Sequence, residues 1–239
     1  MDARRALLGR LIDHAPMFPP AQLPLDEALA DHDAARASDA AWMVNRFVVR
    51  ASQFAPELPK RLSVVADAAI PDDPRVEAVE LPPDGIVPFG DSPGDSPVEV
   101  YVEVPPDADL GPLKERGLRA KIRCGGDRVP TPREIAGFIR ECRRLQLPFK
   151  ATAGLHAAVR HDGAHGFLNV LAAAVFGDEE HALIDEDGDA FALTPEAFSW
   201  RGQKASADRV AIVRRDLFVS IGSCSFFEPV ENLQALGIL

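Results

Sequence analysis

The chain has 239 residues, of which 46% are hydrophobic, so it can form one sizeable core, and no stretch approaches the roughly 20 apolar residues of a membrane span. Its formal net charge of −11 gives a surface that repels phosphate backbones and anionic lipids, which argues against nucleic-acid and membrane partners. Three scattered cysteines without a Cys-x-x-Cys pair are typical of free thiols, and we therefore expect a cytoplasmic protein.

The N-terminal segment 1–40 is expected to be helical. Apolar residues recur at helical spacing over residues 3–14, where the side chains concerned are Leu7, Leu8, Leu11 and Ile12. A proline-rich turn at 15–20 follows, and a second helix is predicted over 25–36, with two acidic residues in its first turn.

Beyond residue 40 the chain alternates between strands and connecting segments. We predict strands at 43–49, 62–66, 76–81, 98–104, 119–124, 149–153 and 217–221. Helices are predicted at 131–145, which begins with the capping sequence Thr131-Pro132-Arg133-Glu134, at 165–176, and from Glu228 onward. Strand, helix, strand order indicates a parallel sheet, so the fold class is α/β, a (β/α)8 TIM-type barrel in one domain, 1–239.

Three connections fit this barrel poorly, which leaves it irregular or incomplete. Segment 67–75 is too short for a helix, and segment 82–97 is rich in proline, glycine, aspartate and serine. Segment 177–216 either contains the eighth strand, near Phe198–Trp200, or is an irregular insertion, and we expect the insertion.

Three neighbouring strands alternate apolar with charged side chains. Because helices cover the outside of such a barrel, the apolar sets should face outward and the charged sets should face the lumen. The inward sets are Glu99, Tyr101 and Glu103, then Lys121 and Arg123, then Lys150 and Thr152. Charges confined in a lumen must pair or shift their pKa values, as in an active site. The alternatives are a sheet with one face in water and a purely structural ion-pair network.

Each of the two inward lysines is followed by glycine. The stretches are K-I-R-C-G-G from Lys121 and K-A-T-A-G-L-H from Lys150, and a turn I-G-S-C-S-F begins at Ile221. Together they resemble the class I aldolases of deoxyribose-phosphate aldolase type over about 50 residues plus the turn. The second stretch, with a later H-G-F-L-N stretch, also resembles an uncharacterised bacterial barrel family.

The aldolase resemblance implies that Lys121 forms a Schiff base with a carbonyl substrate and that Lys150 lowers its pKa. It also implies that the turn containing Gly222 and Ser223 helps to hold a substrate phosphate. The chain departs from the family in the glycine spacing after Lys150, in the long interval from Lys150 to Gly222, and in having Arg123 where the family has a small hydroxyl residue.

Half of the six histidines fall within ten residues after the strand of Lys150. His156, Arg160 and His161 are candidates for binding an anion or moving protons, and we expect this loop to close over the cavity. The same loop suggests an alternative function, a metal-dependent barrel enzyme in which His156, His161 and His165 join Glu103.

The expected function is a lyase of class I aldolase type that acts without a cofactor on a small carbonyl substrate, either phosphorylated or unphosphorylated. Lys121 and Lys150 are its candidate catalytic amines, and Glu103 or His156 would move protons. The candidate substrate-binding residues are Arg123, Thr152, Arg160, His161, Gly222, Ser223 and Ser225, the last two because serines before a helix start favour anions. A third alternative is a non-catalytic barrel that binds a small anion or a protein. The sequence leaves open whether the protein forms a homo-oligomer.

Overall fold

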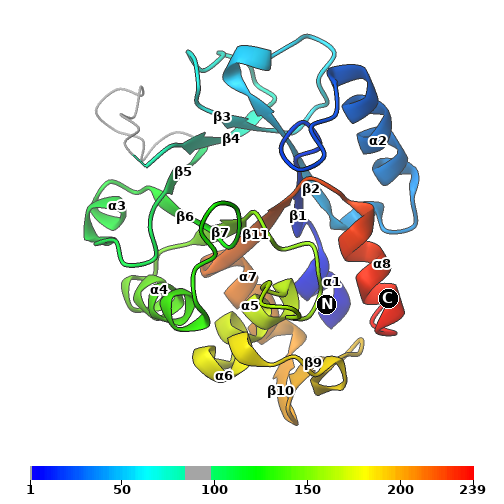
Figure 1. Ribbon diagram of the computed structural model, residues 1–239, viewed down its shortest axis with the longest axis vertical. Coiled ribbons are helices and arrows are strands. Elements are labelled where there is room, and N and C mark those ends of the chain that lie inside the picture. Colours follow the sequence, from blue (N-terminus) through cyan, green and yellow to red (C-terminus); the bar gives the residue numbers. More distant parts are fainter. Residues whose placement is uncertain (1, 84–97) are drawn as a thin grey trace.

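The computed structural model describes residues 2–83 and 98–239, and within them parallel strands form a closed barrel (Figure 1). Eight strands hydrogen-bond in the order β1-β11-β7-β6-β5-β4-β3-β2. Their bounds are β1 Ile12–His14, β2 Val44–Arg50, β3 Leu62–Val65, β4 Val76–Leu81, β5 Glu99–Glu103, β6 Arg119–Arg123, β7 Phe149–Thr152 and β11 Phe218–Ser223. The predicted TIM-type α/β barrel is therefore confirmed.

Helices surround the ring of strands in Figure 1, but not after every strand. Their bounds are α1 Ala3–Leu8, α2 Leu25–Ala37, α3 Gly111–Glu115, α4 Pro132–Leu145, α5 Phe167–Phe176, α6 Glu179–Ile184, α7 Ala207–Asp216 and α8 Phe227–Ala235. Only a short 3-10 turn, Ala51–Gln53, lies between β2 and β3, and no helix joins β3 to β4. None of these helices is long and apolar enough to cross a membrane.

The missing eighth strand comes from the N-terminal segment. The prediction of one helix over residues 3–14 is wrong in its second half, because α1 ends at Leu8 and Ile12–His14 forms β1. The chain turns at Arg10, which has a positive φ of 49°. Leu11 and Ile12 are fully buried, as are the next two residues, so this strand lies in protein on both faces and lacks the alternation that marks a strand.

Segment 177–216 is an insertion, but it is regular. It contains α6, a separate antiparallel sheet and then α7. The sheet consists of β8 Phe191–Leu193, β9 Ala197–Trp200 and β10 Gln203–Ser206. Phe198 and Trp200 therefore belong to this sheet and not to the barrel, and both pack against Phe176 at the end of α5.

The other predicted elements lie close to their expected places. α4 carries the expected capping box between Thr131 and Glu134, and α5 begins at Phe167, two residues later than predicted. Phe149 of β7 packs edge-on against Phe138 of α4, as expected for outward-facing apolar positions. Most of the irregular loop expected at 82–97 lies outside the described residues.

Candidate active site

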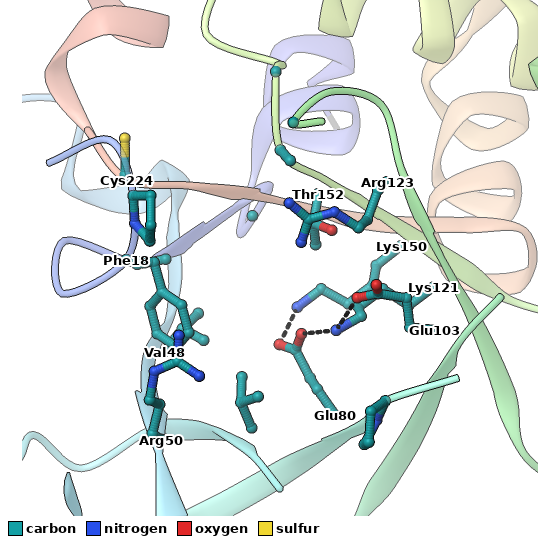
Figure 2. Close-up of a pocket in the computed structure, with 18 of the residues that line it drawn as sticks. Phe18, Val48, Arg50, Glu80, Glu103, Lys121, Arg123, Lys150, Thr152 and Cys224 are labelled. Atoms are coloured by element: carbon teal, nitrogen blue, oxygen red, sulfur yellow. Dashed lines mark hydrogen bonds and ion pairs between the residues drawn. The ribbon is translucent and has the colours of Figure 1, made fainter. Parts of the chain in front are cut away.

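A cavity of about 820 Å³ opens at the carboxyl ends of the barrel strands (Figure 2). Glu103, Lys121, Arg123 and Lys150, which we expected to converge on one cavity, all line it. Glu103 is the last residue of β5, and the other three lie on β6 and β7. Parallel strands bring their carboxyl ends to the same rim, which is where barrel enzymes carry their chemistry.

Strand register places the charged side chains at one level of the lumen. Glu103 is the backbone partner of Lys121 across β5 and β6, and Lys121 is the partner of Lys150 across β6 and β7. Side chains on neighbouring strands at matched positions lie on the same face of the sheet. Three ionisable groups are therefore held side by side by the backbone.

Two lysines and three carboxylates form one ion cluster. The Lys150 amine lies 2.5 Å from Asp13 Oδ2 and 2.7 Å from Glu80 Oε1. The Lys121 amine lies 3.2 Å from Glu80 Oε2 and 3.0 Å from Glu103 Oε2. Glu80 therefore bridges the two lysines, as Figure 2 shows.

The centre of this cluster is fully ionised. Burial alone would lower the pKa of Lys150, but Asp13 and Glu80 outweigh it and hold this pKa above its ordinary value. Burial would raise the pKa of Glu80, but Lys150 and Lys121 hold it far below its ordinary value. Lys150 is thus an ammonium and Glu80 a carboxylate throughout the neutral pH range.

The three carboxylates differ in how completely they are hydrogen-bonded. Glu80 also accepts a hydrogen bond from the Ser63 hydroxyl, and Asp13 accepts hydrogen bonds from Asn45 and Ser220. Glu103 has Lys121 as its one side-chain partner in the described part of the chain, and its side chain is 20% exposed. Glu103 is therefore the carboxylate with free capacity toward the cavity.

The two lysines differ in their exposure and in the length of their contacts to carboxylates. The side chain of Lys150 is 0% exposed, whereas that of Lys121 is 7% exposed. The Lys150 amine also has the shorter contacts to its carboxylates. Lys121 is therefore the lysine that a molecule in the cavity reaches first.

A second polar layer closes the lumen beneath this cluster. The Tyr101 hydroxyl donates to Glu99 and accepts a hydrogen bond from Arg119, and the Lys150 amine lies 5.4 Å from the centre of the Tyr101 ring. Glu99 also pairs with Arg46 at 2.8 Å. Glu99 and Tyr101 thus face the lumen as expected, one level below the cavity.

Two groups at the cavity have unused hydrogen-bonding capacity. Arg123 is exposed, and its guanidinium has no ion pair or hydrogen bond with any side chain that the structure describes. The Thr152 hydroxyl is buried and has no hydrogen-bond partner there either. Gly222 is the register partner of Thr152. A Cβ at position 222 would lie only 3.0 Å from Thr152 Cγ2, so the glycine leaves space for the threonine side chain.

The histidine loop contributes one imidazole to the cavity wall. His156 lines the cavity, and its Nδ1 lies 2.8 Å from Glu228 of α8. His161 is exposed on a turn, and His165 is buried with its Nε2 2.7 Å from the Pro130 carbonyl. The structure therefore brings only His156 of these three to the expected place.

Arg160 also points away from the cavity. It lies 3.5 Å from Glu186, and its backbone amide donates to the side chain of Asn169 on α5. These contacts tie the middle of the histidine loop to the helical insertion. In the described ranges, 2–83 and 98–239, no three histidine, cysteine or carboxylate side chains are grouped as a metal site.

The Gly-Ser turn after β11 is engaged in its own hydrogen bonds. Gly222 lines the cavity, but Ser223 and Ser225 do not. The Ser223 hydroxyl donates to the Ser225 carbonyl, and the Ser225 hydroxyl accepts from the amide of Glu228. Both serines thus shape the turn into α8, and the glutamate there disfavours an anion.

Two members of the ion cluster were missed from the sequence. Asp13 lies on the strand that the helical spacing concealed. Glu80 lies on a predicted strand, but Glu77 three residues earlier breaks the alternation, and the pairing of β3 with β4 shifts register at Leu62 and Ser63. The sequence signal that could have identified Glu80 is a glutamate between two apolar residues, Val79 and Leu81, which are both buried.

Comparisons of the chain with protein-family models, with curated proteins and with solved structures returned no match. The fold therefore stands on the structure alone, and the aldolase resemblance stands on the quoted motifs alone.

Proposed function

We propose that the protein is a Schiff-base lyase of class I aldolase type, in which Lys121 attacks a carbonyl substrate. One observation carries this proposal: the Lys121 amine borders the cavity beside the partly exposed carboxylate of Glu103, whereas Lys150, which lines the same cavity, is 0% exposed and is held by two carboxylates. An amine at a cavity wall and a carboxylate within hydrogen-bond reach of it are the parts that amine catalysis requires.

The first step is a proton transfer followed by an attack. Glu103 accepts a proton from the Lys121 ammonium, and the neutral amine adds to the carbonyl carbon. Glu103 returns the proton to the carbonyl oxygen, and loss of water gives a protonated Schiff base. Cleavage of the adjacent carbon–carbon bond then moves its electron pair toward the iminium nitrogen, while the hydroxyl proton of the departing aldehyde passes to Glu103 or His156.

Lys150 has an electrostatic role in this proposal. It is a fixed positive charge at the level of Lys121, and the shared Glu80 lies between the two amines with one oxygen on each. The cluster of three carboxylates and two ammonium groups keeps its net charge when a proton moves from Lys121 to Glu103. The transfer is therefore internal and requires no cofactor.

Arg123 and Thr152 are the proposed substrate-binding groups. The Arg123 guanidinium, which has no hydrogen bond or ion pair with a side chain in the described part of the chain, suits a carboxylate or phosphate, which it binds through two hydrogen bonds. The unpartnered Thr152 hydroxyl suits a substrate oxygen. A small anionic carbonyl compound supplies both.

The experiment is reductive trapping with small aldehydes and borohydride, followed by peptide mass mapping. The chain has five lysines, and Lys60, Lys114 and Lys204 are exposed, so they report nonspecific labelling in the same sample. We expect the adduct on Lys121 and its loss in Lys121→Met. An adduct on Lys150 alone would reverse the roles, and labelling no faster than at the exposed lysines would leave a structural ion network or a non-catalytic barrel.

A further inference from the structure

We infer that the substrate carries an apolar group, aromatic or branched aliphatic, on the far side of its carbonyl from Lys121, and that it is not a polyhydroxylated sugar. This inference rests on the proposed Schiff-base function, because Lys121 fixes where the carbonyl lies. It concerns the part of the cavity that the ion cluster leaves unused.

The cavity has two walls of different chemistry. The segment after β1, together with β2 and β3, supplies an apolar wall, whose members are Ala15, Phe18, Val48, Val65 and Ala66. β4 to β7 supply the charged wall, whose members are Glu80, Glu103, Lys121, Arg123 and Lys150. In Figure 2, Phe18 and Val48 lie across the cavity from the two lysines.

Two charged side chains, Arg50 and Asp67, also line the apolar side of the cavity. The Arg50 guanidinium stacks on the Phe18 ring, 4.8 Å from its centre, and has no hydrogen bond or ion pair with any residue that the structure describes. Asp67 in turn accepts two hydrogen bonds from Ser52. The free donors on this side therefore belong to Arg50, whereas the side chains of Phe18, Val48 and Val65 offer a substrate neither donor nor acceptor.

A row of sugar hydroxyls would be bound poorly there. The side chains of Phe18, Val48 and Val65 have no donor or acceptor, so each hydroxyl facing them would lose its water without a replacement. An apolar group instead gains from leaving water at the same place. The volume of about 820 Å³ is typical of pockets for ligands well above three carbons, so the apolar half has room to be filled.

The test compares two aldehydes of opposite character, 3-phenylpropanal and glyceraldehyde, by borohydride trapping on Lys121. Each rate is divided by the rate with a free lysine derivative, which removes differences in intrinsic reactivity. We expect 3-phenylpropanal to label Lys121 about 10-fold faster than glyceraldehyde after this correction.

Three variants locate the effect. Phe18→Ala should lower phenylpropanal labelling about 10-fold and leave glyceraldehyde labelling unchanged, and the nearly isosteric Val48→Thr should lower it less. Phe54→Ala is the matched control, because Phe54 is also half-buried under an arginine, Arg75, but lies outside the cavity. It should change neither rate.

A binding measurement separates the two proposals. The non-carbonyl acids 3-phenylpropanoate and glycerate are titrated by calorimetry into wild-type protein and Phe18→Ala. Stronger binding of the phenyl acid that depends on Phe18, without any trapping, would overturn the lyase and keep the apolar site. Equal trapping of both aldehydes with no effect of Phe18→Ala would overturn the apolar site and keep the lyase. If there is neither trapping on Lys121 nor Phe18-dependent binding of the phenyl acid, both the lyase and the apolar site are overturned.

Discussion

Lys121 and Lys150 are direct partners in the register of β6 with β7, so two ammonium groups stand at one level of the lumen. Their mutual repulsion is tolerated because Glu80 reaches both from β4, with one oxygen on each amine. Glu80 is therefore the residue that links the two halves of the cluster, and Glu103 is left as the carboxylate with free hydrogen-bonding capacity toward the cavity.

The first prediction concerns Glu80→Gln. We expect the free energy of unfolding to fall by about 3–5 kcal/mol, because the substitution removes one charge of a buried ionic cluster and leaves two ammonium groups facing each other. Urea denaturation followed by circular dichroism measures this. Glu141→Gln, which breaks an exposed pair with Arg144, is the control and should change nothing measurable. A loss below about 1 kcal/mol in Glu80→Gln would contradict the bridging role.

The second prediction concerns pH. His14 and His32 are buried with their Nδ1 atoms 3.2 Å apart. Burial, and for His32 also the neighbouring His14, lowers the pKa of each from 6.5 to about 4. Between about pH 4 and pH 6.5, both histidines are therefore neutral in the folded protein but bind protons in the unfolded chain. Stability should be constant above about pH 6.5 and fall toward pH 4, by up to about 1.4 kcal/mol per pH unit for each histidine.

Denaturation midpoints at several pH values test this, with two variants for comparison. His32→Leu should remove about half of the extra slope between pH 6.5 and 4. His161→Gln, at an exposed position on the loop, should keep the wild-type slope. If His32→Leu and wild type lose stability in parallel, other groups carry the dependence.

The third prediction concerns Asn169, which is fully buried on α5. Its side chain accepts from the amide of Arg160 and donates to the carbonyls of Ala182 and Asp185. Asn169→Leu leaves these backbone groups buried without partners, so we expect a loss of about 2–4 kcal/mol in unfolding free energy. Limited proteolysis should also cut the loop around Arg160 faster, and an unchanged cleavage pattern there would argue against this anchor.

The fourth prediction concerns the glycines that follow the two lysine strands. Gly125 and Gly154 touch, and a Cβ on Gly125 would lie 2.8 Å from the Gly154 Cα, against backbone that cannot swing aside. Gly125→Ala should therefore cost about 1–3 kcal/mol of stability and slow trapping at Lys121. Gly137→Ala, in the middle of α4 with open space around it, should instead stabilise by about 0.5–1 kcal/mol. Equal effects would show that packing space is not the cause.

Strand alternation alone predicted which side chains of β5, β6 and β7 face the lumen, because each of these strands is long enough to show a period of two. Glu103, Lys121 and Lys150 follow from it. Asp13 does not, since a strand of three fully buried residues has no alternation to detect. The bridge from Glu80 to both lysines crosses the lumen between strands that are not all neighbours, and no local pattern encodes such a contact.

The position of β1 sets the order in which the molecule can be completed during synthesis. β1 pairs with β2 on one side and with β11 on the other, so the first barrel strand to be made receives its second neighbour only when the last has been made. Asp13 likewise meets Lys150 across 137 residues of chain. A nascent chain that stops before β7 therefore leaves Asp13 without its lysine and Glu80 with Lys121 alone, so the ion cluster is complete only after most of the chain has been made.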